Sequence, residues 1–543
     1  MSGEPPVKAQ CLPFEQIPHT TRLFADYLAD FPKVKGFFSR SPNMSEWLAE
    51  ETGALRYDWD RRSRVADVLE QQNRSWGVSE RTLANLDRFR NGAGAVVTGQ
   101  QVGLFGGPMF SIYKALTAVK LAAQATAAGA ETVPVFWLAT EDHDLAEVNH
   151  TLIPGPDGTP RPLTTASHGL PDAPVSTVSL GREIETVVES AVDLLGAGPV
   201  AEILRSAYRP SETLGSAFAR LFLSLFSEWG VILIDPSDRD LHTIVEPLYR
   251  AAIERAPEFD EALLARGKAL EAAGYHQQVR VTPSSTLLFT LRNGARVPIH
   301  RRRNGHAEFL VEDEGLPKDE LLRRIAAAPH HFSPNVLLRP VVQDYLLPTL
   351  VYTGGAAEVA YFAQAAVVYD RLLGRVTPIL PRFSATLVEP KAQRLLERYG
   401  LAANDVFHDP EALQQKLAAR TLPGELQAAF DHAGHSLGDS LTNIQTALAK
   451  LDSTLVEAAT HAATKMQYQL EQLRARAARA ELRQSELIGR HAVLLSSALF
   501  PNKALQEREI AGVYFLSRYG TELLRYLYAN LHTDCHDHQI IEL

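Results

Sequence analysis

The chain has 543 residues, a length that allows three or four folding units, or one large core with insertions. Hydrophobic residues make up 45% of the chain and charged residues 22%, a globular composition that excludes a wholly disordered protein. With 54 Lys and Arg against 64 Asp and Glu, the net charge of −10 argues against bulk electrostatic binding to nucleic acid or to an anionic membrane.

The beginning of the chain, MSGEPPVKAQ, has no apolar run, so no signal peptide is expected. No stretch of about eighteen uncharged apolar residues occurs, so no membrane-spanning helix is expected either. The two cysteines, Cys11 and Cys535, are too few for a disulfide framework. We therefore expect a cytoplasmic protein.

The first 90 residues predict mostly helix and loop. An apolar strand at 95–98 is followed by a glycine-rich loop and by a helix that begins near Pro108, a residue suited to the first helical turn. A second apolar strand is expected at 133–138 and a third at 231–235. Apolar strands separated by a helix are typical of a parallel sheet that is covered on both faces.

A β insertion is expected at 286–302, where two β-rich runs flank Asn293-Gly294, a dipeptide that suits a tight hairpin turn. The segment 335–389 returns to mixed helix and strand, with Pro and Gly at its turns.

From about residue 411 the pattern becomes helical, and apolar residues recur at spacings of four and three between Leu437 and Ala480. This seam predicts one long helix over 437–490, roughly 80 Å in length at the standard rise. We expect the seam to serve self-association at least in part. The alternative is a long helix buried in a bundle within the chain.

The first candidate for chemistry is the loop TGQQVGLFGGP at 98–108. Glycine lets the backbone approach a ligand closely, and the start of a helix directs free N–H groups at an anion such as a carboxylate or phosphate. The loop is neither a dinucleotide fingerprint nor a P-loop. A structural turn is the alternative, but the carboxyl end of a parallel strand favours a ligand role. The candidate residues are Thr98, Gly99, Gln100, Gln101, Gly103, Gly106, Gly107 and Lys114.

The second candidate is EDHD at 141–144, which follows the second strand. Three carboxylates and a histidine can accept a proton, bind an amine or hold a metal. A helix N-cap with solvated acids is the alternative. A functional role is favoured because carboxylates on either side of His143 could orient its ring. The candidate residues are Glu141, Asp142, His143, Asp144, Asn149 and His150.

A third candidate lies in 335–361. Here Thr353-Gly354-Gly355 followed by Glu358 resembles a capped helix start with a second anion-accepting loop. Ordinary capping and surface charge are the alternative. The candidate residues are Arg339, Gln343, Asp344, Thr353, Gly354, Gly355, Glu358 and Tyr361, together with Arg382 after another short strand.

Three histidines, two aspartates and a cysteine crowd into HTDCHDH at 532–538. A transition metal would bind such ligands in solution. Chain termini are often frayed, however, and four ligands this close rarely complete a tetrahedral site. No metal is therefore expected, and His532, Cys535, His536 and His538 are kept only as the alternative ligand set.

Four segments together resemble the BshC family, the cysteine-adding enzymes of bacillithiol biosynthesis. They are VVTGQQVGLFGGPMFSIYKALTAVKLA at 96–122, PVFWLATEDHDLAEVNH at 134–150, FSPNVLLRPVVQDYLLPTLVYTGGAAEVAYFAQ at 332–364 and LFPNKALQERE at 499–509. Several long matches in the right order are more specific than any single glycine loop.

The resemblance implies an α/β fold with a Rossmann-like parallel-sheet core, connecting insertions of which one contains the β-hairpin, and a C-terminal α-helical coiled-coil domain that forms a homodimer. We expect the core in 1–404, with insertions at about 151–230 and 275–330. The coiled-coil domain is expected at 405–495, and a helical segment that packs back on the core at 496–543.

The implied reaction joins the carboxyl of L-cysteine to the amine of glucosaminyl-malate, the last step of bacillithiol biosynthesis, so the implied enzyme is a ligase that forms a carbon–nitrogen bond. By analogy with mycothiol ligase, ATP is expected as a co-substrate that activates cysteine as an adenylate, with no tightly bound cofactor. The amine must lose a proton, which calls for a base such as His143 or Asp142, with Asp144 beside them.

The malate moiety carries two carboxylates, which suit Arg339, Arg382 or Lys114. The TGQQ loop could hold a phosphate or carboxylate beside them. Such chemistry requires that the loop at 98–108 and the acidic segment at 141–144 face each other across a single crevice.

Two other functions remain open from the sequence. One is a metal-dependent hydrolase or lyase built on EDHD and His150. The other is a non-catalytic scaffold whose working part is the coiled coil.

Overall fold

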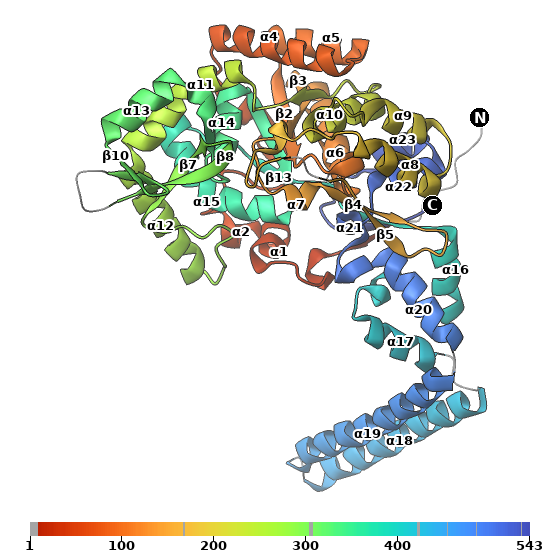
Figure 1. Cartoon of the computed structure of the whole chain (residues 1–543). Helices are drawn as coiled ribbons and strands as arrows, with labels where there is room; N and C mark the ends of the chain where they lie inside the picture. The colour runs from red at the N-terminus through yellow and green to blue at the C-terminus, as the bar shows by residue number, and fades with distance from the viewer. Residues whose placement is uncertain are drawn as a thin grey trace. The chain divides into compact units, whose positions relative to one another are not determined.

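A computed structural model describes residues 9–166, 169–302, 308–420, 424–452, 454–484, 486–533 and 535–543 (Figure 1). The chain divides into two compact units. The core unit is Cys11–Ala385 with Glu507–Gln539, and the helical unit is Met1–Gln10, Thr386–Gln506 and Ile540–Leu543. The chain passes between the units within the strands β1 (Ala9–Leu12), β14 (Ala385–Val388) and β15 (His538–Glu542). The boundaries expected at 404 and 495 stay predictions.

A five-stranded parallel sheet forms the centre of the core unit, in the order β13-β12-β2-β3-β6. Its strands are β2 (Gly94–Gln100), β3 (Thr132–Leu138), β6 (Ile232–Ile234), β12 (Thr349–Gly354) and β13 (Ile379–Pro381). The strands expected at 95–98, 133–138 and 231–235 are confirmed, as is their parallel arrangement.

Both faces of this sheet are buried, which explains the apolar runs within its strands. Val96 packs with α6 (Phe110–Ala127), the helix that links β2 to β3, on one face. Val97 points to the other face and joins a core that includes Leu69 of α4 (Trp59–Trp76). Alternate residues of a strand point to opposite faces, so a strand covered on both sides carries apolar residues at successive positions.

The remaining helices of the core unit surround the sheet and its insertions. They are α1 (Arg22–Ala29), α2 (Phe31–Val34), α3 (Leu48–Ala54), α5 (Glu80–Arg90), α7 (Leu145–Val148), α8 (Glu183–Leu195), α9 (Pro199–Ala207), α10 (Leu214–Leu225), α11 (Arg239–Glu254), α12 (Ala256–Ala272), α13 (Lys318–Ala327), α14 (Arg339–Leu346), α15 (Ala356–Leu373), α22 (Gly512–Tyr519) and α23 (Glu522–Asn530). The short strands β4 (His150–Pro154) and β5 (Pro160–Thr164) form an antiparallel pair after α7.

A second, antiparallel sheet has the order β10-β9-β8-β7-β11. Its strands are β7 (Ser285–Arg292), β8 (Ala295–Arg301), β9 (Phe309–Val311), β10 (Glu314–Leu316) and β11 (Phe332–Pro334). Asn293 (φ 52°) and Gly294 (φ 84°) form the two-residue turn between β7 and β8. Two successive positive φ angles are what such a hairpin turn requires, and the predicted hairpin is confirmed.

The helical unit contains two long helices, α18 (Gly424–Leu451) and α19 (Leu455–Gln484), which lie side by side (Figure 1). Its other helices are α16 (Pro390–Tyr399), α17 (Pro410–Ala419) and α20 (Glu486–Leu499), and α21 (Gln506–Glu509) begins at its last residue. The hydrogen bond from Gln445 to Thr460 and the ion pair between Arg474 and Asp431 show that α18 and α19 run antiparallel.

The prediction of one continuous helix over 437–490 is therefore wrong. α18 ends at Leu451, and the backbone N–H of Thr454 donates to Asp452 Oδ1 (2.9 Å) in the turn before α19. An Asp side chain that accepts a hydrogen bond from two residues ahead stabilises a turn in place of a further helical turn. A turn does not need proline, and the absence of proline did not exclude one here.

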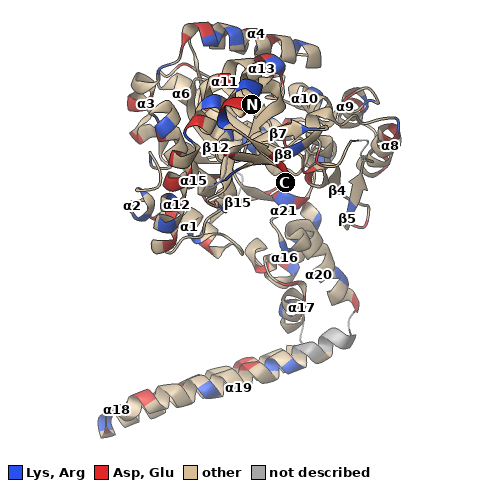
Figure 2. Ribbon diagram, turned by 60° about the vertical axis from the view of Figure 1, so that its left-hand side comes forward, with Lys and Arg blue, Asp and Glu red and all other residues tan. Residues whose placement is uncertain are grey.

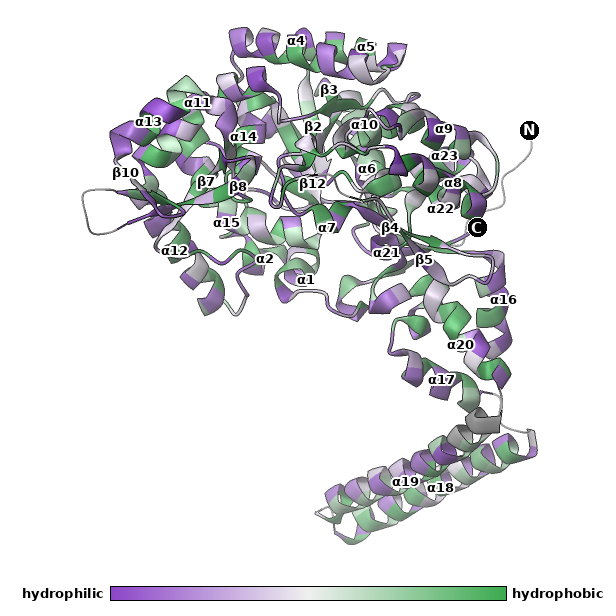
Figure 3. Cartoon of the chain, in the orientation of Figure 1, coloured by the Kyte–Doolittle hydropathy of each residue, from purple (hydrophilic) through white to green (hydrophobic). Residues whose placement is uncertain are grey.

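Apolar side chains of this helical hairpin remain exposed within one chain. Ile444 is 52% exposed, Met466 50% and Leu473 56%. Apolar residues recur along both helices (Figure 3), and both signs of charge are interspersed with them (Figure 2). Among the described helices, none combines the length and apolarity that crossing a membrane requires.

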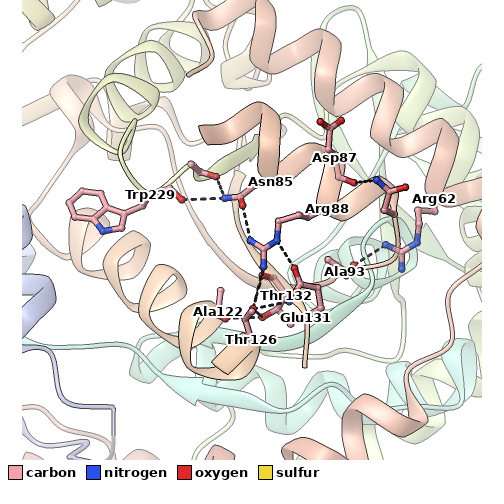
Figure 4. A network of polar contacts seen from close by, with 12 residues as sticks. Arg62, Asn85, Asp87, Arg88, Ala93, Ala122, Thr126, Glu131, Thr132 and Trp229 are labelled. Carbon is pink, nitrogen blue, oxygen red and sulfur yellow. Dashed lines mark hydrogen bonds and ion pairs between the residues drawn. The ribbon is translucent and has the colours of Figure 1, made fainter. Parts of the chain in front are cut away.

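The amino edge of the parallel sheet is held by a polar network centred on Arg88 of α5 (Figure 4). Arg88 donates to Asn85 Oδ1 (2.8 Å), to the carbonyl of Thr132 (3.0 Å) and to Glu131 Oε1 (2.5 Å). Thr126, at the end of α6, accepts the N–H of Thr132. This Arg88 network ties α5 and α6 to the first residue of β3, so the sheet is anchored at the edge where its central strands begin.

Candidate active site

A cavity of about 960 Å³ lies at the opposite, carboxyl edge of the parallel sheet. Residues that follow β2, β3, β6, β12 and β13 all line it, and its far wall is formed by β7 and β8. Open α/β sheets bind ligands at the carboxyl ends of their strands, where the connecting loops diverge. The antiparallel insertion thus closes the side of the cavity that the sheet leaves open.

The loop after β2 and the acidic segment after β3 meet in this cavity. Gln101 Nε2 donates to Asp142 Oδ2 (3.0 Å) and also contacts the carboxylate of Glu147. Gln100, Gln101, Glu141 and Asp142 all line the cavity. The predicted proximity of the two segments across one crevice is confirmed.

The glycines of the first loop divide into two groups. Gly99 and Gly103 line the cavity, whereas Gly106 and Gly107 lie outside its lining and form the turn before α6. Their φ angles of 86° and 69° are in the region that only glycine adopts without strain. A Cβ on Gly103 would stand 3.0 Å from Gly107 Cα. The loop therefore combines a ligand-facing part with a tight structural turn.

Lys114 of α6 is a buried cation at this edge. Its Nζ donates to the carbonyl of Gly99 (2.7 Å) and to Gln100 Oε1 (2.8 Å), and pairs with Glu358 Oε2 (2.6 Å). Burial lowers the pKa of Lys114 to about 8, although Glu358 opposes the shift. Glu358 also accepts the N–H of Gly355 (2.7 Å) at the start of α15, so the capped helix start predicted there is confirmed.

Two arginines complete a cationic wall beside Lys114. Arg339 donates to the hydroxyl of Tyr361 (2.7 Å) and to Gln343 Oε1 (3.3 Å), both neutral groups. Arg382 instead forms an ion pair with the buried carboxylate of Glu507 (2.6 Å). Arg339 is thus the cation whose hydrogen-bond partners do not neutralise its charge, which suits an anionic ligand.

Glu141 forms the acidic wall. Burial raises the pKa of Glu141 to about 8, and Asp235 adds to this effect while Arg296 opposes it. Its Oε1 lies 3.4 Å from His242 Nε2 but makes no hydrogen bond within the described ranges. Burial lowers the pKa of His242 to about 4, so the imidazole is neutral near pH 7 and this contact is not an ion pair.

His143 stands at the rim of this wall. Arg296 Nη1 lies 3.1 Å from His143 Nδ1, and because a guanidinium only donates, Nδ1 accepts this hydrogen bond. The same Nη1 is 3.8 Å from Asp142 Oδ1, and the guanidinium stacks over the ring of Phe289 at 4.0 Å. Arg296 therefore orients the ring of His143 through Nδ1. The other ring nitrogen, Nε2, takes no part in this hydrogen bond.

Two family models together match almost the whole chain. Residues 7–383 match the model described as "Bacillithiol biosynthesis BshC, N-terminal Rossmann-like domain", and residues 385–543 match "Bacillithiol biosynthesis BshC, C-terminal coiled-coil domain". The chain belongs to the BshC family. The expected family and fold class, a Rossmann-like core with a C-terminal coiled-coil domain, are confirmed.

Curated relatives named "Putative cysteine ligase BshC" are similar to this BshC chain over nearly its full length. The protein from Koribacter versatilis is 49% identical over 98% of this chain and 99% of its own. The relative from Solibacter usitatus is 35% identical over the same shares, and that from Salinibacter ruber is 35% identical over 96% of each chain. Their names agree with the expected enzyme class, a ligase.

Among the predicted site residues of this BshC chain, thirteen line the cavity. They are Gly99, Gln100, Gln101, Gly103, Lys114, Glu141, Asp142, His150, Arg339, Gly355, Glu358, Tyr361 and Arg382. His150 donates from Nδ1 to the carbonyl of Ala146 (2.9 Å), which leaves its Nε2 for other partners.

Other predicted residues have contacts that hold the surrounding structure. Asp144 is exposed and caps α7 by accepting the N–H of Glu147 (3.3 Å), the role given above as the alternative. Gln343 donates to Asp344, which also accepts the hydroxyl of Tyr369 (2.7 Å). The cavity lining does not include Thr98, Gly106, Gly107, His143, Asp144, Asn149, Gln343, Asp344, Thr353 or Gly354.

The sequence did not point to three residues that this BshC chain places in or beside the cavity. Arg296 and Phe289 come from the hairpin strands β8 and β7, and His242 comes from α11. None of them belongs to a local motif, and each reaches the site only through tertiary packing. The one available signal was an Arg two residues after the Asn293-Gly294 turn, in a strand that is otherwise half apolar.

The segment HTDCHDH does not form a metal site in the described residues. His538 is buried and its Nδ1 lies 2.7 Å from Ser384 Oγ. Asp534 lies outside the described residues. Within the described ranges, no group of three or more His, Cys, Asp or Glu side chains is arranged to hold a metal ion.

Proposed function

We propose that this BshC chain is an ATP-dependent ligase that joins the carboxyl of L-cysteine to the amine of glucosaminyl-malate, the last step of bacillithiol biosynthesis. The observation that carries the proposal is the cavity itself, which places a cationic wall and an acidic wall at one sheet edge. The names of the curated relatives support the cysteine substrate.

The cationic wall suits the malate carboxylates. Arg339 presents a guanidinium whose hydrogen-bond partners are neutral, and it can bind a carboxylate through two parallel hydrogen bonds. Arg382 and Lys114 each have a carboxylate partner and add positive potential beside it. We therefore assign malate binding first to Arg339.

The loop after β2 suits the activated cysteine. Lys114 holds Gln100 by its Oε1, so the NH2 group of Gln100 is the part able to donate to a ligand. Gly99 lies so close to Trp137 that a Cβ would stand 3.1 Å from its backbone oxygen, and glycine keeps the backbone accessible there. A carboxylate or phosphate bound beside Lys114 would gain the charge of the ammonium.

The chemistry begins with attack of the cysteine carboxylate on the α-phosphorus of ATP, which gives the adenylate and pyrophosphate. The neutral amine of glucosaminyl-malate then attacks the acyl carbon, the amide bond forms, and AMP leaves. The amine must give up a proton. We assign this proton to Glu141 because its carboxyl lines the cavity and its pKa of about 8 is close to working pH.

His143 and Asp142, the bases first expected, keep supporting roles in this proposal. Asp142 accepts a hydrogen bond from Gln101, and His143 accepts one from Arg296. Both groups are therefore already engaged, whereas Glu141 Oε1 has no hydrogen bond among the described residues.

Mass spectrometry of the purified protein with L-cysteine, glucosaminyl-malate and ATP tests the proposal. The condensed thiol and AMP should form together, and neither should form when ATP or cysteine is left out. Release of ADP would replace the adenylate by an acyl phosphate. Failure to form the thiol with folded protein under any of these conditions would refute the ligase assignment.

We further infer that two copies of the chain associate through the helical hairpin of α18 and α19. The exposed Ile444, Met466 and Leu473 supply the apolar surface that a partner would cover. Substituting all three with Glu should yield monomers in light scattering, and a dimer that persists in this variant would contradict the inference. A cytoplasmic location stays a prediction.

A further inference from the structure

The two cysteines of the chain, 524 positions apart in sequence, lie next to each other in the core unit. Cys11 Sγ and Cys535 Sγ are 3.1 Å apart and are not joined by a disulfide bond. This separation is a thiol–thiol contact, longer than a disulfide bond, which needs about 2.05 Å. Cys11 is exposed, so a small reagent can reach the pair from solvent.

A second contact joins the segments that carry the two cysteines, three residues after each of them. The ring of Phe14 packs edge-on against the ring of His538, with centroids 6.2 Å apart. Phe14 also packs against Phe24 of α1 at 5.0 Å. The two thiols are therefore held together by neighbouring side chains, and their approach does not depend on the sulfur atoms alone.

We propose that Cys11 and Cys535 form a reversible intramolecular disulfide by exchange with a low-molecular-weight disulfide. One thiolate attacks the small disulfide, which gives a mixed disulfide and releases one small thiol. The second cysteine then attacks the protein sulfur of the mixed disulfide and releases the other small thiol. In sum, two protein thiols and one small disulfide give one protein disulfide and two small thiols.

The surroundings of the pair make this exchange slow and dependent on the thiol poise. Burial raises the pKa of Cys11 to about 11, and Cys535 and Asp537 add to the shift. Little Cys11 thiolate is therefore present at neutral pH, so casual oxidation is disfavoured. The pair should stay reduced when small thiols predominate and close when their disulfides accumulate.

Closure would link residues near the two ends of the sequence and would reach the cavity through one buried network. Cys535 lies three residues before His538, whose Nδ1 contacts Ser384 Oγ (2.7 Å). Ser384 donates to Glu507 (2.9 Å), and Glu507 holds Arg382 in the cavity wall. A disulfide at residue 535 would restrict the segment that supports this network, whatever reaction the cavity performs.

The test exposes the full-length protein to mixtures of cystine and cysteine, blocks remaining thiols with iodoacetamide and maps peptides under non-reducing conditions. We expect a cross-linked peptide pair lighter by two hydrogens, in excess of cysteine adducts by about tenfold, because the neighbouring thiol competes at a high effective concentration. The cross-linked protein should have a higher melting temperature than the reduced protein, since a link between distant residues restricts the unfolded chain.

The variants Cys11→Ser and Cys535→Ser are the matched controls. Each should take up one cysteine adduct and lose the shift in melting temperature between cystine and cysteine. Wild-type protein that carries two separate cysteine adducts, or two alkylated thiols at saturating cystine, would overturn the proposal. So would a bridge found only between two chains on a non-reducing gel.

Discussion

Arg88 at the amino edge of the parallel sheet and Glu141 at its carboxyl edge differ in their hydrogen bonding. At the amino edge, Arg88 makes hydrogen bonds to Asn85, Glu131 and the start of β3. At the carboxyl edge, Glu141 Oε1 is buried without a hydrogen bond among the described residues. The same strands run through both edges, so the difference lies between the segments that precede the strands and the loops that follow them.

This difference distinguishes polar groups that stabilise the fold from polar groups that remain able to bind a ligand. A buried polar group that is fully hydrogen-bonded stabilises the fold and has little left to offer a ligand. A buried group without a partner keeps a shifted pKa and a free site for a hydrogen bond, as Glu141 does. The comparison therefore predicts catalytic effects at the carboxyl edge and stability effects at the amino edge.

The largest effect is expected from Glu141→Gln. Loss of the proton acceptor should lower kcat/KM for thiol formation by about 10²–10⁴-fold while the protein stays folded. The wild-type rate should rise with pH toward about 8 as Glu141 ionises, and the variant should lose this ascending limb. Rates measured by mass spectrometry across this pH range check the prediction.

The pH dependence of folding stability provides an independent test of Glu141→Gln. The folded pKa of Glu141, about 8, exceeds its ordinary value of 4.5, so its ionisation lowers the stability of wild-type protein as pH rises between these values. The Gln variant should lose less stability over this window. Glu189→Gln, in an exposed pair with Arg205, is the control and should change neither kcat/KM nor the loss of stability over this pH window. Unchanged kinetics in Glu141→Gln would show that another residue is the base.

Arg339→Met should raise KM for glucosaminyl-malate by about 10–100-fold, because a charge-assisted contact to the malate carboxylates is lost. The effect should vanish when glucosamine without malate is the amine substrate. Initial rates with both substrates measure this coupling. An equal loss with both substrates would show that Arg339 supports the fold or another substrate.

Arg88→Met tests the amino edge. It removes the Arg88 donor from Asn85 Oδ1 and one of the two donors to the Thr132 carbonyl, and should reduce the free energy of unfolding by about 1–2 kcal/mol, with kcat/KM per folded molecule unchanged. The midpoint of urea unfolding measures the loss. Arg74→Met, which removes an exposed pair with Glu70, is the control with a smaller expected shift. A catalytic defect in Arg88→Met would erase the contrast between the edges.

The smallest effect is a pH dependence of KM. The pKa of Lys114, about 8, lies below its ordinary value of 10.5, so the ammonium loses its charge above pH 8 in the folded protein. KM for the substrate whose carboxylate or phosphate binds beside Lys114 should rise by at most about tenfold per pH unit above 8. In Lys114→Met, KM should be high and flat from pH 7 to 9. A flat wild-type profile would place Lys114 outside substrate binding.

Much of the fold could be predicted from local patterns. The apolar strands β2 and β3 are buried on both faces, and such burial requires the uninterrupted apolar runs that the sequence shows. Asn293-Gly294 fixed the hairpin because these residues adopt positive φ easily. The coiled-coil spacing predicted helix correctly but not the break at Asp452, where the side chain accepts the N–H of Thr454 and stabilises a turn between two antiparallel helices.

The site could be predicted only in part, because local patterns do not show which distant elements meet. Gln101 and Asp142 follow neighbouring parallel strands, so their order in the sheet brings them together. Arg296 and His242 come from elements with no sequence link to those strands. Their contribution depends on how the insertions pack over the sheet edge.

The sequence by itself determined the parallel core, the hairpin and the two loops that carry glutamines and carboxylates, because each depends on residues close together in the chain. Tertiary structure alone decided that Glu141 Oε1 is buried without a hydrogen bond among the described residues, that Arg339 has neutral hydrogen-bond partners, and that Cys11 meets Cys535. These properties depend on desolvation and on contacts between distant segments, and no local pattern encodes either.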